Sequence, residues 1–214
     1  NLAAYEIADQ VRLIQHATNE KCTNVVFMGM GEPLLNLPEV IDALATMSSS
    51  LGLGIGRRHT TVSTVGLVEG MEMLLKSPVR VKLAVSLNFV DEDMRKEYMP
   101  AARSNPLREI LKLARKYSSK KDMVTFEYVM ISGINDSLGD AQRLIRLLKG
   151  IPSKINLIPY NEHPRLIFKR PADERVQSFY ESLLQSRHTV VIRKSRGQKI
   201  LAGCGQLAGT DVMQ

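Results

Sequence analysis

The chain has 214 residues, of which 44% are hydrophobic and 24% charged, and 29 Lys and Arg against 22 Asp and Glu give a net charge of +7. This composition is typical of one globular domain over residues 1–214, and no apolar run approaches the roughly 18 residues that a membrane helix requires, which argues against a membrane protein. The two cysteines, Cys22 and Cys204, are too few for a disulfide framework, so we expect a cytoplasmic protein, and the basic charge favours a polyanionic partner.

Short β-branched apolar runs alternate with helical patterns along the chain, which is the signature of βαβ units around a parallel sheet. The fold class is therefore expected to be α/β. Strands are predicted at residues 24–30, 60–65, 81–88, 124–131, 154–160 and 189–194. Helices are predicted at residues 5–18, 37–49, 67–75, 91–98, 107–117, 138–149 and 173–184. Residues 162–171 follow neither pattern and are interpreted as a long loop at a strand end.

Two of the helices carry clear start signals. Asn105 can cap the helix over residues 107–117, and Pro106 suits its first position. Asn135, Asp136 and Ser137 precede the helix over residues 138–149 in a similar way. We expect the apolar stripe of each helix to pack on the sheet.

Small polar groups follow several of the predicted strands. In an open α/β sheet or barrel, ligands bind outside the carboxyl ends of the strands, so these groups predict a polar small-molecule site. They are Gly29, Gly31 and Glu32 after the first strand, Ser63 and Thr64 in the second, Ser86 and Asn88 in the third, and Tyr160 and Asn161 after the fifth. The alternative is that each is a turn former, as Ser and Asn at strand ends commonly are. The dinucleotide fingerprint, the P-loop and the G-x-S-x-G elbow are all absent from the sequence.

Cys204 lies between Gly203 and Gly205, which indicates a sterically open thiol. Nearby cations, including Arg193 and Arg196, could lower the pKa of this thiol or hold a phosphate backbone. The alternative is a small buried side chain, which is the commoner setting of a lone cysteine.

Six segments match one known family in the same order along the chain. They are GMGEPLLN from Gly29, VSTVG from Val62, LAVSLN from Leu83, EYVMISGIND from Glu127, KINLIPYN from Lys154, and RKSRG followed by GCGQLAG near the end. Together they resemble the radical SAM adenosine methyltransferases of ribosomal and transfer RNA, the RlmN/Cfr family. The resemblance implies a partial open (βα) barrel of parallel strands. Five barrel strands would be present, the family's first strand and cluster loop would be missing, and a C-terminal extension would carry Cys204.

The resemblance also implies a site. S-adenosylmethionine would be bound by Gly31, Glu32, Ser63, Ser86, Leu87, Asn88 and Asn161. Cys204 would be catalytic as a covalent methyl carrier, from which a carbon radical adds to adenine, at carbon 2 by default or at carbon 8 as the alternative. Asn88 replaces the histidine that is usual in the family, and an asparagine can still hydrogen-bond a ribose.

The implied partners are 23S rRNA and/or tRNA and a reducing electron donor, and we expect a monomer. Candidate phosphate contacts are Arg57, Arg58, Arg193, Lys194 and Arg196.

The family's [4Fe-4S] cluster is held by a C-x3-C-x2-C loop, and this sequence has no such loop. We interpret the chain as the core of an active RNA methyltransferase whose N-terminal part is not included, so that these residues alone are inactive. The alternative is a cluster-less relative that binds S-adenosylmethionine or RNA without catalysis. An unrelated barrel enzyme such as an aldolase is disfavoured, because no Schiff-base lysine or set of metal ligands stands at the strand ends.

Overall fold

A computed structural model describes residues 1–163 and 166–193, and its centre is one parallel sheet of six strands in the order β1-β2-β3-β4-β5-β6. The strands are β1 Val25–Phe27, β2 Thr60–Thr64, β3 Lys82–Ser86, β4 Val124–Met130, β5 Ser153–Pro159 and β6 Thr189–Ile192. All six predicted strands are confirmed. The expected count of five barrel strands is wrong by one, because β6 pairs in parallel with β5 and continues the sheet.

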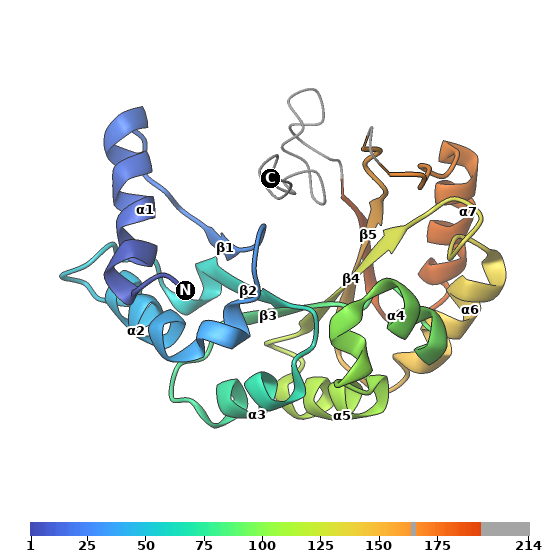
Figure 1. Ribbon diagram of the computed structural model, residues 1–214, viewed down its shortest axis with the longest axis horizontal. Coiled ribbons are helices and arrows are strands. Elements are labelled where there is room, and N and C mark those ends of the chain that lie inside the picture. The colour runs from blue at the N-terminus through green and yellow to red at the C-terminus, as the bar shows by residue number, and fades with distance from the viewer. Residues whose placement is uncertain (164–165, 194–214) are drawn as a thin grey trace, which may run out of the picture.

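The helices lie along the outer side of the curved sheet and leave its concave side open (Figure 1). They are α1 Ala4–Thr18, α2 Leu37–Ser48, α3 Val68–Lys76, α4 Glu92–Tyr98, α5 Leu107–Tyr117, α6 Leu138–Leu147 and α7 Asp173–Leu184. Three short 3-10 helices, η1 Pro33–Asn36, η2 Arg57–His59 and η3 Pro100–Arg103, complete the connections. Each predicted helix is confirmed to within one or two residues at its ends. None of the helices in the described residues is long and apolar enough to cross a membrane.

The two faces of the sheet differ in chemistry, because side chains alternate between them with period two. The face toward the helices contributes to the main core through buried apolar residues, including Val62, Leu83, Val85, Phe126, Tyr128, Ile155 and Leu157. The concave face carries Thr61, Ser63, Ser86, Thr125, Glu127 and Asn156, all of which are half-buried except the buried Glu127. A polar, partly open face with helices behind it is the arrangement expected of a ligand-binding barrel rather than of a closed core.

The start of α6 follows the sequence signal, whereas the start of α5 does not. Ser137 and Asp140 form a capping box at the first turn of α6, where the Ser137 hydroxyl accepts from the amide of Asp140. The prediction that Asn105 caps α5 is wrong. The Oδ1 of Asn105 accepts from the amide of Val68, the first residue of α3, at 2.8 Å. The amide of Leu107, the first residue of α5, donates instead to Glu92 Oε2 at 2.9 Å.

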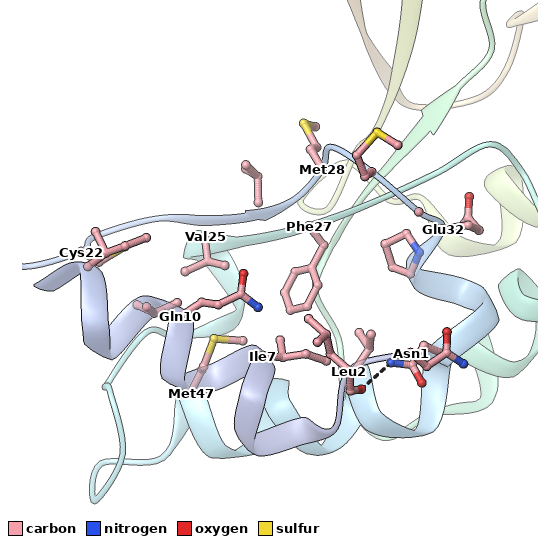
Figure 2. A pocket seen from close by; sticks show the side chains of 18 of the residues that line it. Asn1, Leu2, Ile7, Gln10, Cys22, Val25, Phe27, Met28, Glu32 and Met47 are labelled. Carbon is pink, nitrogen blue, oxygen red and sulfur yellow. Dashed lines mark hydrogen bonds between the residues drawn. The ribbon is translucent and has the colours of Figure 1, made fainter. Parts of the chain in front are cut away.

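The outer edge of β1 has no partner strand within residues 1–163 and 166–193. A groove of about 680 Å³ runs between α1, β1 and α2, and its lining includes Ile7, Ile14, Val25, Phe27, Met30 and Met47. Figure 2 shows Val25 and Phe27 pointing from β1 into this groove, with Glu32 at its far end. The sheet thus exposes one strand edge together with an apolar surface beneath it.

Candidate active site

Glu32 is held at the carboxyl ends of β1 and β2 by two backbone amides. Its Oε1 accepts from the amide of Leu34 at 3.1 Å, and its Oε2 accepts from the amide of Val65 at 2.8 Å. Gly29 and Gly31 precede it with φ of 120° and 83°, and a Cβ added at either glycine would meet nothing within 4 Å. These glycines therefore give the strand end a backbone that a ligand can approach closely, with an oriented carboxylate beside it.

Ser63 and Glu127 meet on the concave face. The Ser63 hydroxyl donates to Glu127 Oε2 at 3.1 Å, and the sheet register places Glu127 opposite Ser86. Glu127 is only 6% exposed, so its carboxylate is a strong acceptor in a partly dry setting. Our sequence reasoning missed Glu127 as a site residue. A carboxylate in the otherwise hydrophobic strand VTFEYVM was the signal that could have found it.

Arg193 reaches across the concave face from the end of β6. Its Nη1 lies 3.6 Å from Glu127 Oε1 and 3.8 Å from Met28 Sδ, and its amide donates to the carbonyl of Leu157 at 2.8 Å. Met28 follows β1 and Arg193 follows β6, so side chains from the two opposite edges of the sheet come together here. Arg193 is thus directed into the concave face, and its role as a phosphate contact stays a prediction.

The strand end Ser86-Leu87-Asn88 is shaped by the backbone of β4. The amides of Leu87 and Asn88 both donate to the carbonyl of Glu127, at 3.0 and 3.1 Å, and Asn88 has a positive φ of 56°. Leu87 is fully buried, with its side chain in the core and its amide bonded to β4, so the half-buried Ser86 and Asn88 are the residues of this strand end that a ligand can reach. Asn88 Oδ1 accepts from the amide of Val129 at 3.2 Å, which leaves its Nδ2, 3.7 Å from Met99 Sδ, as the side-chain group able to bond a ribose.

Asn161 follows β5 on the same rim and is 3% exposed. An aromatic cluster covers this part of the rim, in which Phe89 stacks on Tyr98 and the ring of Phe168 meets both Tyr98 and Tyr160 edge-on. Burial, followed by the charge of Glu162, raises the pKa of Tyr160. Within residues 162–163 and 166–171 there is no helix or strand, as the loop prediction expected.

Several predicted residues do not join this site. Cys204, Lys194 and Arg196 lie outside the described residues. Arg57 and Arg58 belong to η2, which directly precedes β2 and so lies at the amino end of the sheet, and Arg57 lies 3.6 Å from Asp122. Across the described part of the chain no group of three or more His, Cys, Asp or Glu side chains is placed to hold a metal ion.

Comparison with known proteins gives a consistent picture. The chain is 47% identical over 210 residues to the protein "Dual-specificity RNA methyltransferase RlmN" of Geobacter sulfurreducens, and the match covers 98% of this chain and 58% of the relative. It is 48% identical over 217 residues to the protein of the same name from Anaeromyxobacter dehalogenans, covering 97% of this chain and 58% of the relative. The chain therefore spans about three fifths of the length of the curated relatives it matches.

A crystal structure of a radical SAM methyltransferase from Sphaerobacter thermophilus superposes with a TM-score of 0.89 at 39% identity, over 96% of this chain and 62% of that one. Streptococcus suis SuiB bound to S-adenosylmethionine shares the fold with a TM-score of 0.65 at 17% identity, over 91% of this chain and 44% of that one. The sequence model of the radical SAM superfamily matches residues 3–147. Members of this superfamily use S-adenosylmethionine together with a [4Fe-4S] cluster. The fold, the strand-end site and these matches agree, and the chain belongs to the radical SAM superfamily.

Proposed function

We propose that this chain is the cofactor-binding core of a radical SAM RNA methyltransferase that methylates carbon 2 of adenine in 23S rRNA and/or tRNA, with Cys204 as the methyl carrier. The observation that carries the proposal is the meeting of Glu32, Ser63 and the Ser86-Leu87-Asn88 strand end at the carboxyl side of one sheet. The RNA substrate is supported by the names of the relatives. Adenine carbon 2 and the role of Cys204 rest on the family resemblance of the motifs.

S-adenosylmethionine would supply the methyl group and, with a reduced cluster, the radical. The Glu32 carboxylate already accepts two amide hydrogen bonds and has acceptor capacity left for the cofactor's ammonium group. Ser63 and Glu127 offer a hydroxyl and a carboxylate to the polar groups of the bound molecule. The exposed Gly31 and the half-buried Ser86 and Asn88, on either side of the buried Leu87, would lie against it, and Asn161 would close the rim.

The cluster does not fit the residues of this chain. A [4Fe-4S] cluster needs three thiolates close together, and the sequence holds only two cysteines, far apart along the chain. We assign its ligands to a part of the whole protein outside these 214 residues, and we derive no step of the reaction from it.

Cofactor binding is tested with the native protein that contains this chain. Glu32→Gln removes the charge that faces the ammonium group while keeping the size of the side chain. We expect its affinity for S-adenosylmethionine in equilibrium dialysis to fall at least about tenfold, which is the value of one charged hydrogen bond. The exposed Glu72 of α3 is the matched control, and Glu72→Gln should bind like the wild type. Equal affinity for all three proteins would refute the site.

The reaction itself is tested with the reconstituted native protein and unmodified 23S rRNA or tRNA. Mass spectrometry of the digested RNA, compared with 2-methyladenosine and 8-methyladenosine standards, decides between carbon 2 and carbon 8. Cys204→Ala should abolish the product while leaving S-adenosylmethionine affinity unchanged. A methylated product from Cys204→Ala would exclude the covalent carrier.

The absence of a C-x3-C-x2-C loop from this sequence favours one second candidate, a relative that binds S-adenosylmethionine or RNA without catalysis. Iron and sulfide analysis of the native protein after anaerobic purification separates the two. About four irons per chain supports the methyltransferase, and a protein that binds S-adenosylmethionine but takes up no iron supports the binding relative.

A further inference from the structure

Arg95 is the largest fully buried side chain of the described residues, with 0% exposure, and it is not one of the candidate site residues. It lies on α4, the helix that follows β3 along the chain. Burial lowers the pKa of its guanidinium, and the nearby Glu92 carboxylate raises it. Because burying a guanidinium is unfavourable unless it is paired and hydrogen-bonded, its hydrogen-bond partners indicate which part of the structure it holds in place.

The partners of Arg95 are backbone carbonyls of two loops. Its Nη2 donates to the carbonyl of Val65 at 2.5 Å, and its Nη1 donates to the carbonyl of Asn105 at 3.3 Å. The next residue, Gly66, has a φ of 95°, and a Cβ added there would lie 2.7 Å from Ile110 Cδ1 and 3.3 Å from Arg95 Nη2. The turn after β2 is therefore packed closely against the guanidinium.

Val65 connects this buried cation to the candidate active site. While its carbonyl accepts from Arg95, its amide donates to Glu32 Oε2 at 2.8 Å. Among the residues that the structure describes, the Glu32 carboxylate accepts one other hydrogen bond, from the amide of Leu34. The position of Val65 therefore sets the position of one of the two Glu32 oxygens.

We infer that Arg95 is a positioning residue for the cofactor site: it fixes Val65, and Val65 holds the Glu32 carboxylate in the orientation that receives the ammonium group of S-adenosylmethionine. This inference rests on the proposed role of Glu32. Arg95 itself touches no ligand, since its side chain is buried behind the turn. Its contribution is pre-organisation, so that binding does not have to order the carboxylate.

Asn105 provides the matched control for a purely structural role. Its Oδ1 accepts from the amide of Val68, and its Nδ2 donates to the carbonyl of Ala101, both at 2.8 Å. It thus supports the same loop three residues beyond Val65. If Arg95 only stabilises the loop, Asn105→Ala should disturb cofactor binding as much as a change at Arg95.

The experiment measures S-adenosylmethionine affinity of the native protein by equilibrium dialysis, with the melting temperature recorded for each variant. Arg95→Met removes both hydrogen bonds and the buried charge, and we expect affinity to fall about tenfold. Arg95→Lys keeps the charge but lacks the planar guanidinium, and its affinity should fall by less, about threefold. This variant keeps the test available if Arg95→Met does not fold. Asn105→Ala should lower the melting temperature while its affinity stays within about twofold of the wild type.

A double-mutant cycle gives the decisive comparison. If Arg95 acts through Glu32, Arg95→Met combined with Glu32→Gln should bind no more weakly than Glu32→Gln alone. The inference is overturned if Arg95→Met and Arg95→Lys bind like the wild type while Glu32→Gln is weak, if the two losses add, or if Asn105→Ala weakens binding equally. Wild-type affinity of Glu32→Gln would instead refute the proposed function, and the inference with it.

Discussion

Replacing Asn135 should destabilise the protein more than its small size suggests. Asn135 is 2% exposed, its Nδ2 donates to the carbonyls of Asn88 and Val129 at 2.8 Å each, and its Oδ1 accepts from the amide of Ile131 at 2.7 Å. Asn135→Ala leaves three backbone groups without these partners, the buried amide of Ile131 and the partly buried carbonyls of Asn88 and Val129. Each such group costs roughly 1–3 kcal/mol, and partial hydration recovers some of it, so we expect a loss of about 3–4 kcal/mol in the free energy of unfolding. That is a large share of the roughly 5–15 kcal/mol of a typical protein.

Urea unfolding of the native protein, followed by circular dichroism, measures this loss as a lower midpoint at an unchanged slope. Asn135→Asp sharpens the test, because its carboxylate can accept from Ile131 but faces two carbonyls. Its folded-state pKa should be raised, so the neutral acid is favoured in the folded state. The stability of this variant should therefore improve as pH falls toward about 4 and be lost as pH rises. A loss below about 1 kcal/mol for Asn135→Ala, or no pH effect for Asn135→Asp, would refute the reasoning.

Three further predictions follow from other parts of the fold. Gly66→Ala should destabilise by roughly 2–4 kcal/mol in the same assay, because it adds a clash with Ile110 to a positive φ, whereas Gly133→Ala, at φ 72° in open space, should cost only about 1–2 kcal/mol. Burial lowers the pKa of His188 despite its hydrogen bond to Ser153, so the free energy of unfolding should decrease as pH falls below about 6.5. His188→Gln should reduce this dependence of the free energy of unfolding on pH, and an equal dependence in both proteins would contradict the prediction. Residues 1–214 expressed alone should melt at low temperature and bind hydrophobic dyes at the open β1 edge, and a sharp melt at about 45–65 °C without dye binding would count against this.

Much of the fold could be predicted because the signals were local. Short β-branched apolar runs and the helical patterns between them predicted the order and type of the six strands and seven α-helices, and Ser137 caps α6 as expected. Asn105 shows where local reasoning fails. Its side chain fits the cap pattern of α5, but its oxygen accepts a hydrogen bond from the amide of Val68 instead of capping α5. No one-dimensional pattern reveals that α3 begins within reach of this residue.

The positions of some candidate site residues were predictable from the sequence, whereas their hydrogen-bond partners were not. Glycines and a carboxylate after a short apolar strand indicated Gly31 and Glu32, because only the direction of the backbone was needed. The partners of that carboxylate were not predictable, since Val65 lies 33 residues away and Arg95 acts from the far side of a turn. Glu127 was overlooked because the sequence does not show which strands are neighbours. The sheet register is what places this carboxylate beside Ser63 and Ser86.

The alternation of the strands has a consequence for how this protein can evolve. On each strand, one set of side chains packs against helices while the intervening set faces the concave side. A substitution at Ser63 or Asn156 can alter what is bound without disturbing the core, and one at Val62 or Leu157 does the reverse. Tolerance to mutation should therefore rise and fall with every second residue along β2 to β5. Substitutions on the concave face can therefore change ligand binding during evolution while the face toward the helices keeps the fold stable.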